Sequence, residues 1–178
     1  SSLRLYPAGS GYAAATKASA QADGYAFMVR GGTLERMLGP LKALTVLPSP
    51  SGRYILYSYL NRNTVSAALY DTTTHVATAL PVVALPDKCV WAADESSLYC
   101  GIPRAIEGEW PDDWYQGVTH FTDRIWRIDL DGRVASQIVD PNLVADVEID
   151  AVALAIDPAS DVLVFTNRKD GSLWLYDL

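Results

Sequence analysis

Short apolar runs separated by polar turns recur along the chain, and the last pair shows the unit most clearly. Residues 157–160, Asp-Pro-Ala-Ser, have turn composition, because proline presets its own backbone angle and an aspartate side chain bonds nearby backbone N–H groups. Residues 162–165 and 173–176 are apolar runs of β-branched and aromatic type, too short for helices, so each predicts a strand. The polar residues 167–171 between them predict a second turn.

The same turn-and-strand unit occurs three more times upstream, beginning at Tyr6, Ser49 and Ala92, with the first copy the weakest. With Asp157 as the fourth start, the spacings are 43, 43 and 65 residues. A period in the forties with about four short strands per unit is typical of a β-propeller blade. Short connections also favour antiparallel pairing, since parallel pairing needs long crossovers. The pattern predicts an all-β propeller of about four blades, each a four-stranded antiparallel meander.

We expect one propeller domain over residues 1–178, built from units at about 1–40, 41–82, 83–142 and 143–178. The second unit is the most regular, with strands predicted at residues 43–47, 53–58, 65–70 and 75–80. In the third, the inner strand contains Cys89 and the next ends near residue 101.

The fourth unit lacks an outer strand. Its predicted strands cover residues 151–156, 162–166 and 173–176, after which the sequence ends. Residues 1–5 cannot supply the fourth strand, because they already predict the inner strand of the first unit. Such an arc exposes apolar surface and an unpaired strand edge. We therefore expect part of a larger propeller, completed by a missing segment of the polypeptide, a second copy or a partner chain, and an oligomer in solution.

Two stretches carry a family resemblance. SPSGRYILYS at residues 49–58 and DPASDVLVFTNRKDGSLWLYDL at residues 157–178 resemble the repeat of the Tol translocation protein and of prolyl-oligopeptidase-type propellers, with WD-like blades. That repeat has a Ser-Pro-Asp-Gly turn, an apolar strand and an aromatic-rich strand ending in Asp. Ser51 and Ala159 replace the turn aspartate here. The resemblance implies the fold and little about a ligand, because propellers host many unrelated functions.

The composition of the chain narrows the classes of partner that we expect. The chain is 49% hydrophobic and 20% charged with a net charge of −7, which is typical of a globular protein. Nucleic acid is not an expected partner, because no basic cluster is present to meet the phosphates. The apolar runs are too short for a membrane span. No spacing of Cys, His or carboxylates indicates a metal, and no phosphate-binding loop is complete, so no cofactor is expected.

The two cysteines, Cys89 and Cys100, lie on neighbouring predicted strands of the third unit. A tight turn at Asp94-Glu95 places them opposite each other, within reach of a disulfide. Two buried free thiols are the alternative. A bridge implies an oxidising compartment, so we expect an extracytoplasmic location: periplasmic, secreted or at the cell surface.

An insertion at residues 102–123 makes the third unit about 15 to 17 residues longer than the others. A smaller excess lies at residues 141–149, and both connections should emerge on one face, because each reverses an even number of strands. Long loops on a rigid scaffold often carry binding groups. We expect a protein or carbohydrate partner to be gripped by aromatic and polar side chains of this loop: Trp110, Asp112, Asp113, Trp114, Tyr115 and His120. Alternatively, Trp110 and Trp114 pack inward and fix the loop.

No catalytic residue is expected. Asp112 and Asp113 are adjacent, so their side chains tend to point apart, and His120 with Asp123 has no nucleophile beside it. The favoured interpretation is a non-catalytic binding or interaction propeller. A glycan-processing enzyme and a structural piece of a larger surface or envelope assembly are the alternatives, which glycan turnover, sugar binding and partner capture distinguish.

Overall fold

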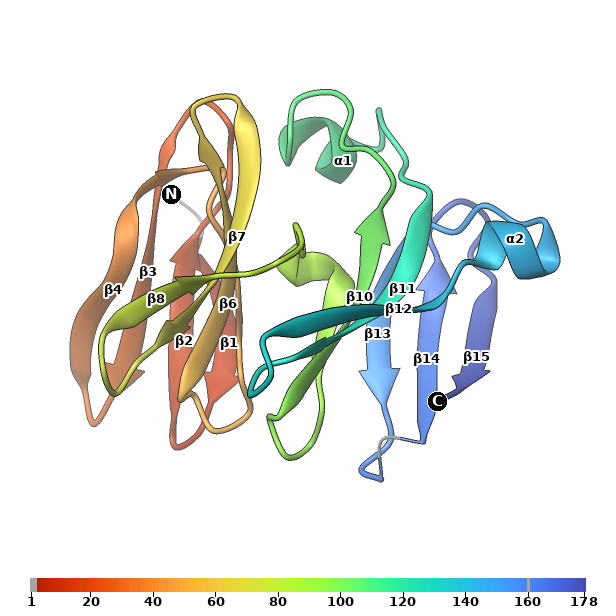
Figure 1. Ribbon diagram of the computed structural model, residues 1–178. Helices are drawn as coiled ribbons and strands as arrows, with labels where there is room; N and C mark the ends of the chain where they lie inside the picture. The colour runs from red at the N-terminus through yellow and green to blue at the C-terminus, as the bar shows by residue number, and fades with distance from the viewer. Residues whose placement is uncertain (1–2, 160) are drawn as a thin grey trace.

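The computed structural model describes residues 3–159 and 161–178, which form an all-β, four-blade propeller of antiparallel sheets arranged in a ring (Figure 1). Sheet 1 consists of β1 (Leu3–Ala8), β2 (Gly11–Thr16), β3 (Asp23–Arg30) and β4 (Thr33–Lys42), and sheet 2 of β5 (Thr45–Pro48), β6 (Tyr54–Asn61), β7 (Thr64–Asp71) and β8 (Val76–Ala79). Sheet 3 consists of β9 (Cys89–Trp91), β10 (Ser97–Pro103), β11 (Asp123–Asp129) and β12 (Val134–Val139), and sheet 4 of β13 (Ala151–Ile156), β14 (Val162–Asn167) and β15 (Leu173–Asp177).

Within each sheet, every strand pairs with the next one along the chain, which confirms the predicted meander. In the described part of the chain, three short helices lie between strands: η1 (Pro86–Lys88) before β9, α1 (Asp112–Gln116) inside the insertion, and α2 (Pro141–Ala145) between sheets 3 and 4. The predicted inner strand at residues 1–5 is observed from Leu3 onward, and its first two residues lie outside the described ranges.

Consecutive sheets are joined by apolar clusters, because each strand alternates its side chains between the two faces of its sheet. Leu44, Ile55 and Met28 belong to the cluster between sheets 1 and 2, whereas Leu98 and Ile128 belong to the one between sheets 2 and 3. The third cluster, between sheets 3 and 4, is built from Ile125, Val139, Ile149, Leu163 and Phe165. Among the described residues, no apolar cluster joins sheet 4 back to sheet 1.

The outward faces of the first and last sheets are apolar and open. On sheet 1, Leu3 and Leu5 are 56% and 64% exposed. Leu173 and Leu175 on β15 are 74% and 64% exposed. In the part of the chain that the structure describes, sheet 4 has three strands, as expected, and β15 pairs only with β14.

The disulfide between Cys89 and Cys100 is present, which confirms the predicted bridge. The two residues are direct cross-strand partners in the β9–β10 pair. Both side chains are buried among the apolar residues between sheets 2 and 3, with Cys100 fully enclosed.

Reducing this disulfide is expected to lower the free energy of unfolding by about 3 kcal/mol, because the open bridge frees a short loop in the unfolded chain. Urea unfolding of the oxidised protein, the reduced protein and the Cys89→Ala/Cys100→Ala variant measures this loss. The double variant should match the reduced protein. Equal midpoints for oxidised and reduced protein would show that the bridge contributes nothing.

Candidate functional site

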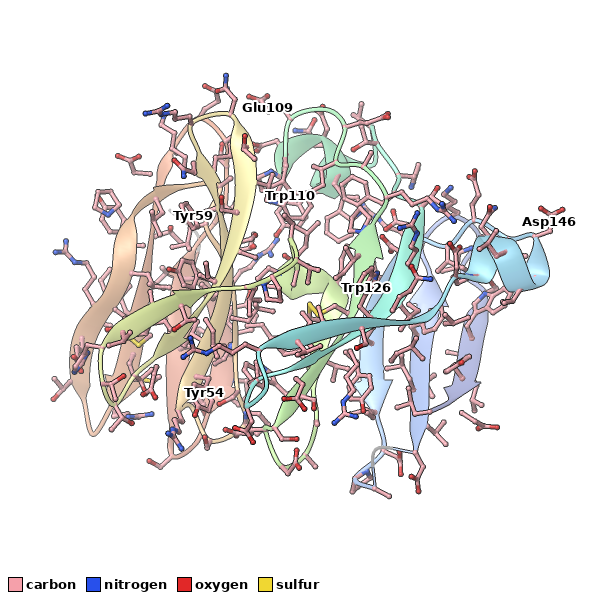
Figure 2. The ribbon with its side chains drawn as sticks, viewed as in Figure 1. Tyr54, Tyr59, Glu109, Trp110, Trp126 and Asp146 are labelled. Carbon is pink, nitrogen blue, oxygen red and sulfur yellow. A yellow bond between two sulfur atoms is a disulfide. The ribbon has the colours of Figure 1, made fainter. Side chains whose placement is uncertain are left out.

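The insertion leaves sheet 3 at the end of β10 and contacts all four sheets before returning at β11. Asp112 accepts a hydrogen bond at 2.7 Å from the N–H of Ala20, in the connection between β2 and β3 of sheet 1. Trp110 packs against Leu60 of sheet 2, between that sheet and the insertion (Figure 2). The Trp114 indole donates to Asp150, the residue directly before β13 of sheet 4. The loop is therefore an ordered cap that ties the four sheets together.

Aromatic side chains form the core of this cap. The Trp114 ring is stacked on Phe121, with centroids 6.1 Å apart, and lies 5.5 Å from Trp110 and from Tyr115. Trp110 and Trp114 are only 3% and 4% exposed. Gly117 ends α1 with a φ of 76°, which lets the chain turn back at low steric cost. Neither indole presents its flat face to solvent.

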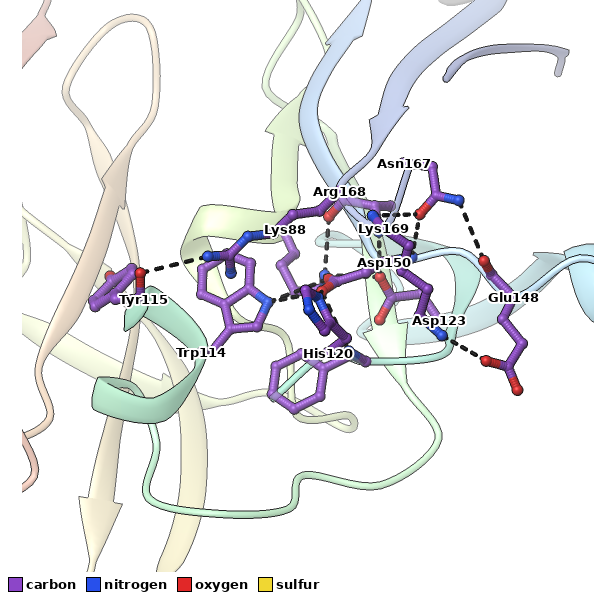
Figure 3. A network of polar contacts seen from close by, with 12 residues as sticks. Lys88, Trp114, Tyr115, His120, Asp123, Glu148, Asp150, Asn167, Arg168 and Lys169 are labelled. Carbon is purple, nitrogen blue, oxygen red and sulfur yellow. Dashed lines mark hydrogen bonds and ion pairs between the residues drawn. The ribbon is translucent and has the colours of Figure 1, made fainter. Parts of the chain in front are cut away.

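Beneath this aromatic core lies a fully buried ion network that sequence reasoning missed (Figure 3). The Lys88 ammonium donates to Asp150, lies 2.8 Å from Asp123 and donates to the Ala151 carbonyl at 2.9 Å. All three charged side chains have no exposed surface. The one available signal was a lysine in the apolar stretch at residues 84–91, where a charge needs buried partners.

The two aspartates differ in how well their charge is satisfied. Asp150 accepts from Lys88, from the Trp114 indole at 3.0 Å and from the Phe121 N–H at 3.2 Å. Asp123 accepts from the Ala151 N–H, but its second oxygen has no partner among the described residues. Burial raises the pKa of Asp123 to about 6, although the charge of Lys88 opposes the rise. With this raised pKa, Asp123 takes up a proton at a higher pH than an ordinary aspartate does.

The raised pKa of Asp123 predicts a specific pH dependence of stability. The folded protein binds this proton more tightly than the unfolded chain, so the stabilisation is present below about pH 4 and is lost as the pH rises through 6. Between about pH 4 and 6, the free energy of unfolding of the wild type should fall by up to about 1.4 kcal/mol per unit of rising pH, relative to that of the Asp123→Asn variant. Urea unfolding of both proteins from pH 4 to 8 measures the difference. A difference that does not vary with pH would exclude the assignment.

A second polar cluster connects the loop to sheet 1. The Tyr115 hydroxyl donates to Asp87 at 2.8 Å and accepts from Arg4 of β1, also at 2.8 Å. Burial and the nearby Asp87 charge raise the pKa of Tyr115, which keeps its hydroxyl protonated. The guanidinium of Arg168, in the turn between β14 and β15 of sheet 4, lies over the Trp114 ring, 4.5 Å from its centroid. The loop thereby links the first and last sheets, which lack direct apolar packing.

The six candidate residues have different surroundings. Trp110 and Trp114 form the buried core, and Asp112, Asp113 and Tyr115 bond within the protein, Asp113 to the Glu109 N–H. The side chain of His120 is 44% exposed, with Nδ1 3.7 Å from Asp150 rather than beside Asp123. His120 lines an open polar hollow of about 560 Å³, together with Arg104, Glu107, Asn142 and Glu148.

This hollow is built by both chain insertions. The Asp123 N–H donates to the Ile149 carbonyl at 2.7 Å, and Arg104 pairs with Asp140, next to α2. These contacts confirm the expectation that residues 102–123 and 141–149 lie side by side on one face. Three apolar side chains are strongly exposed here: Val118, which lines the hollow, at 68%, and Leu143 and Val144, which follow the lining residue Asn142 on α2, at 78% and 72%. We call these three residues with the hollow the insertion face.

Two further hollows border the insertion, between its first half and sheets 1 and 2. They measure about 740 and 360 Å³, and both include Leu60, Asn63, Gly108 and Trp110.

Within residues 3–159 and 161–178, no group of three or more His, Cys, Asp and Glu side chains is placed to hold a metal ion. No helix in these ranges is long and apolar enough to cross a membrane.

Comparisons with known proteins establish the class, which is the β-propeller. The chain is similar to TolB from Acinetobacter baumannii, with a TM-score of 0.64 and 11% identity over 98% of this chain and 41% of that one. It is also similar to a putative TolB from Agrobacterium tumefaciens, with a TM-score of 0.59 and 16% identity over 95% and 62% of the chains. An oligogalacturonate lyase in complex with manganese matches at a TM-score of 0.61 and 13% identity, over 99% and 57%.

These similarities show the fold alone, and they include an enzyme as well as TolB proteins. The chain spans between about two fifths and three fifths of the lengths of these three structures. No protein-family model matches the sequence, and no curated protein matches it.

Proposed function

We propose that this chain is an extracytoplasmic, non-catalytic binding propeller whose insertion face binds a protein partner. The single observation that carries the proposal is the combination of exposed Val118, Leu143 and Val144 with a polar hollow on one rigid face. Protein interfaces combine apolar anchors, which supply most of the binding energy, with hydrogen-bonding groups around them. Within this proposal, His120 contacts the partner, and the other five candidate residues hold the loop in its binding shape.

The ordered cap supports this proposal physically. A loop bonded to all four sheets loses little conformational freedom on binding, so less of the interaction energy is spent on ordering it. Its buried indoles favour a protein over a carbohydrate, because a sugar ring usually stacks on an exposed aromatic face, and Trp110 and Trp114 offer none. The Cys89–Cys100 disulfide supports an oxidising, extracytoplasmic compartment.

The proposal includes completion of the propeller by a further segment, a second copy or a partner chain. The exposed leucines of sheet 1 and of β15 form apolar sheet faces, which propellers normally bury against neighbouring blades. Among the described residues, the edge of β15 away from β14 has no strand partner, so it is available to a fourth strand. In sedimentation experiments, residues 1–178 in isolation should therefore form oligomers or aggregate. The Leu5→Glu/Leu175→Glu variant should do so to a smaller extent. A stable monomer that this double substitution leaves unchanged would exclude completion.

The binding test compares two variants of the native protein in which exposed apolar side chains are replaced by glutamate. Leu143→Glu/Val144→Glu places two charges on the insertion face, and Val134→Glu, on the 54% exposed Val134 of β12, is the control that adds one charge elsewhere on the surface. Affinity purification with quantitative mass spectrometry should identify a protein whose recovery falls by about tenfold or more with the first variant only. Equal recovery of the partner with the wild type and with both variants would contradict a protein-binding site on this face.

The same material separates the alternatives. Saturable binding on a glycan array, lost in His120→Ala, would replace the protein partner by a carbohydrate. Turnover of a glycan substrate by the purified wild type would replace a binding role by an enzymatic one. Failure of partner capture, glycan binding and turnover together would favour a purely structural piece of a larger envelope assembly.

A further inference from the structure

The buried ion network beneath the cap carries more negative than positive charge. Among the described residues, Lys88 is the one lysine or arginine that pairs with Asp123 or Asp150, and all three side chains have no exposed surface. Asp123 is mostly ionised at pH 7, since its pKa is about 6. One ammonium therefore faces two carboxylates. Buried charge that is not fully compensated is costly, so a second positive charge beside the network would stabilise it.

His120 is placed to supply this second charge. Its Nδ1 atom lies 3.7 Å from Oδ2 of Asp150, which is within ion-pair distance but longer than a hydrogen bond (Figure 3). The side chain lines the hollow of the insertion face and is 44% exposed, so it exchanges protons with solvent. A histidine side chain gains a positive charge as the pH falls from 8 to 5. An ion pair with Asp150 therefore exists only at the acid end of this range.

The Asp150 carboxylate is the point at which the core of the cap is attached to the segment before β13. Its Oδ2 atom accepts from the Trp114 indole at 3.0 Å and from the Phe121 N–H at 3.2 Å, whereas Lys88 donates to Oδ1. Both Trp114 and Phe121 belong to the aromatic core of the insertion. A cation beside Oδ2 offsets the excess charge at this attachment point, so it should hold the whole cap more firmly.

The other charged groups around His120 do not supply the missing charge. Arg104 pairs with Asp140 on the far side of the hollow, and Lys169 pairs with Glu148. The Arg168 guanidinium is stacked on Trp114 and makes no ion pair with Asp150 among the described residues. The carboxylate of Glu107, which also lines the hollow and has no ion pair in the described ranges, attracts a cation at His120 as well.

We propose that His120 is a pH-dependent latch of the insertion, which pairs with Asp150 when protonated and releases it when neutral. The stabilisation is present at about pH 5.5 and is lost as the pH rises towards 8, because only the protonated ring forms the pair. Asp123 acts in the same direction, since it also takes up a proton in acid. On the proposed function, the insertion face is then best ordered for its partner at acid pH, and this consequence alone rests on that function.

Amide hydrogen exchange of residues 112–121 tests the latch without any partner. Protection factors, which correct for the intrinsic pH dependence of exchange, are compared for the wild type and His120→Gln. At pH 5.5 the wild type should be about fivefold better protected, the effect of one partly exposed ion pair, and at pH 8 the two should be equal. His75→Gln, at the other histidine, in the β7–β8 turn, is the matched control and should behave as the wild type at both pH values.

A permanent charge at the same position separates a latch from a purely structural role. His120→Lys carries its charge at both pH values, so it should keep at pH 8 the protection that His120→Gln lacks at pH 5.5. The same ratio of wild type to His120→Gln at both pH values, a larger ratio at pH 8, or no protection by lysine at pH 8 would overturn the latch. Such a result would leave partner binding untouched, just as failed partner capture would leave the latch untouched.

Discussion

Replacing Lys88 by methionine is expected to lower the free energy of unfolding by about 3 to 5 kcal/mol at pH 7. The substitution keeps most of the side-chain volume but removes the cation that two buried carboxylates share, those of Asp123 and Asp150. An uncompensated buried charge costs far more than a lost surface pair. Urea unfolding followed by tryptophan fluorescence measures the loss.

The cause can be separated from a packing effect. Adding Asp123→Asn and Asp150→Asn to Lys88→Met removes the unpaired charges and should recover much of the lost stability. Lys169→Met is the control, since Lys169 pairs with the 61% exposed Glu148 on the surface, and it should cost less than about 1 kcal/mol. If Lys88→Met were no more costly than Lys169→Met, the network would not be an essential part of the fold.

Truncating Trp114 to alanine is expected to cost about 3 to 5 kcal/mol as well. Its indole is 4% exposed, stacks on Phe121 and donates to Asp150 at 3.0 Å, so the change opens a cavity and removes a donor from a buried carboxylate. Hydrogen exchange should accelerate for the amides of residues 105–120 more than for those of the sheets, because the cap loses its core.

Trp114→Phe separates the packing of this side chain from its hydrogen bond, and Tyr12→Ala is a control at an exposed aromatic residue. Phenylalanine at this position should restore most of the packing but not the hydrogen bond, giving a loss of about 1.5 to 3 kcal/mol. Tyr12→Ala, at a residue that is 54% exposed, should change stability by no more than about 0.5 kcal/mol. A loss for Trp114→Ala as small as that for Tyr12→Ala would mean that the cap does not depend on its aromatic core.

The fold was predictable because each strand of a propeller blade is specified mainly by a short, contiguous segment of the sequence. Each strand needs only a few β-branched or aromatic residues between turn residues, so β13, β14 and β15 coincide with their predicted ranges to within a residue. The Cys89–Cys100 pairing followed from the same strand positions, since residues opposite each other across a tight turn are fixed by register.

The site was less predictable because its contacts join residues far apart in sequence. Lys88, Asp123 and Asp150 come from three chain segments, and the fold alone brings them together. The aromatic residues of the insertion were recognised as unusual. Whether Trp110 and Trp114 face inward or outward depends on the space between Leu60, Leu85 and the loop, which no local pattern encodes.

The most direct test of a binding role for the insertion face is site-specific photo-cross-linking in cells that produce the protein. A benzophenone amino acid is placed at Val118 on the insertion, and at exposed Ala93 in the β9–β10 turn at the opposite end of sheet 3. We predict a discrete cross-linked protein from position 118 and none from position 93. Cross-linking from position 93 alone, or the same product from both positions, would contradict it.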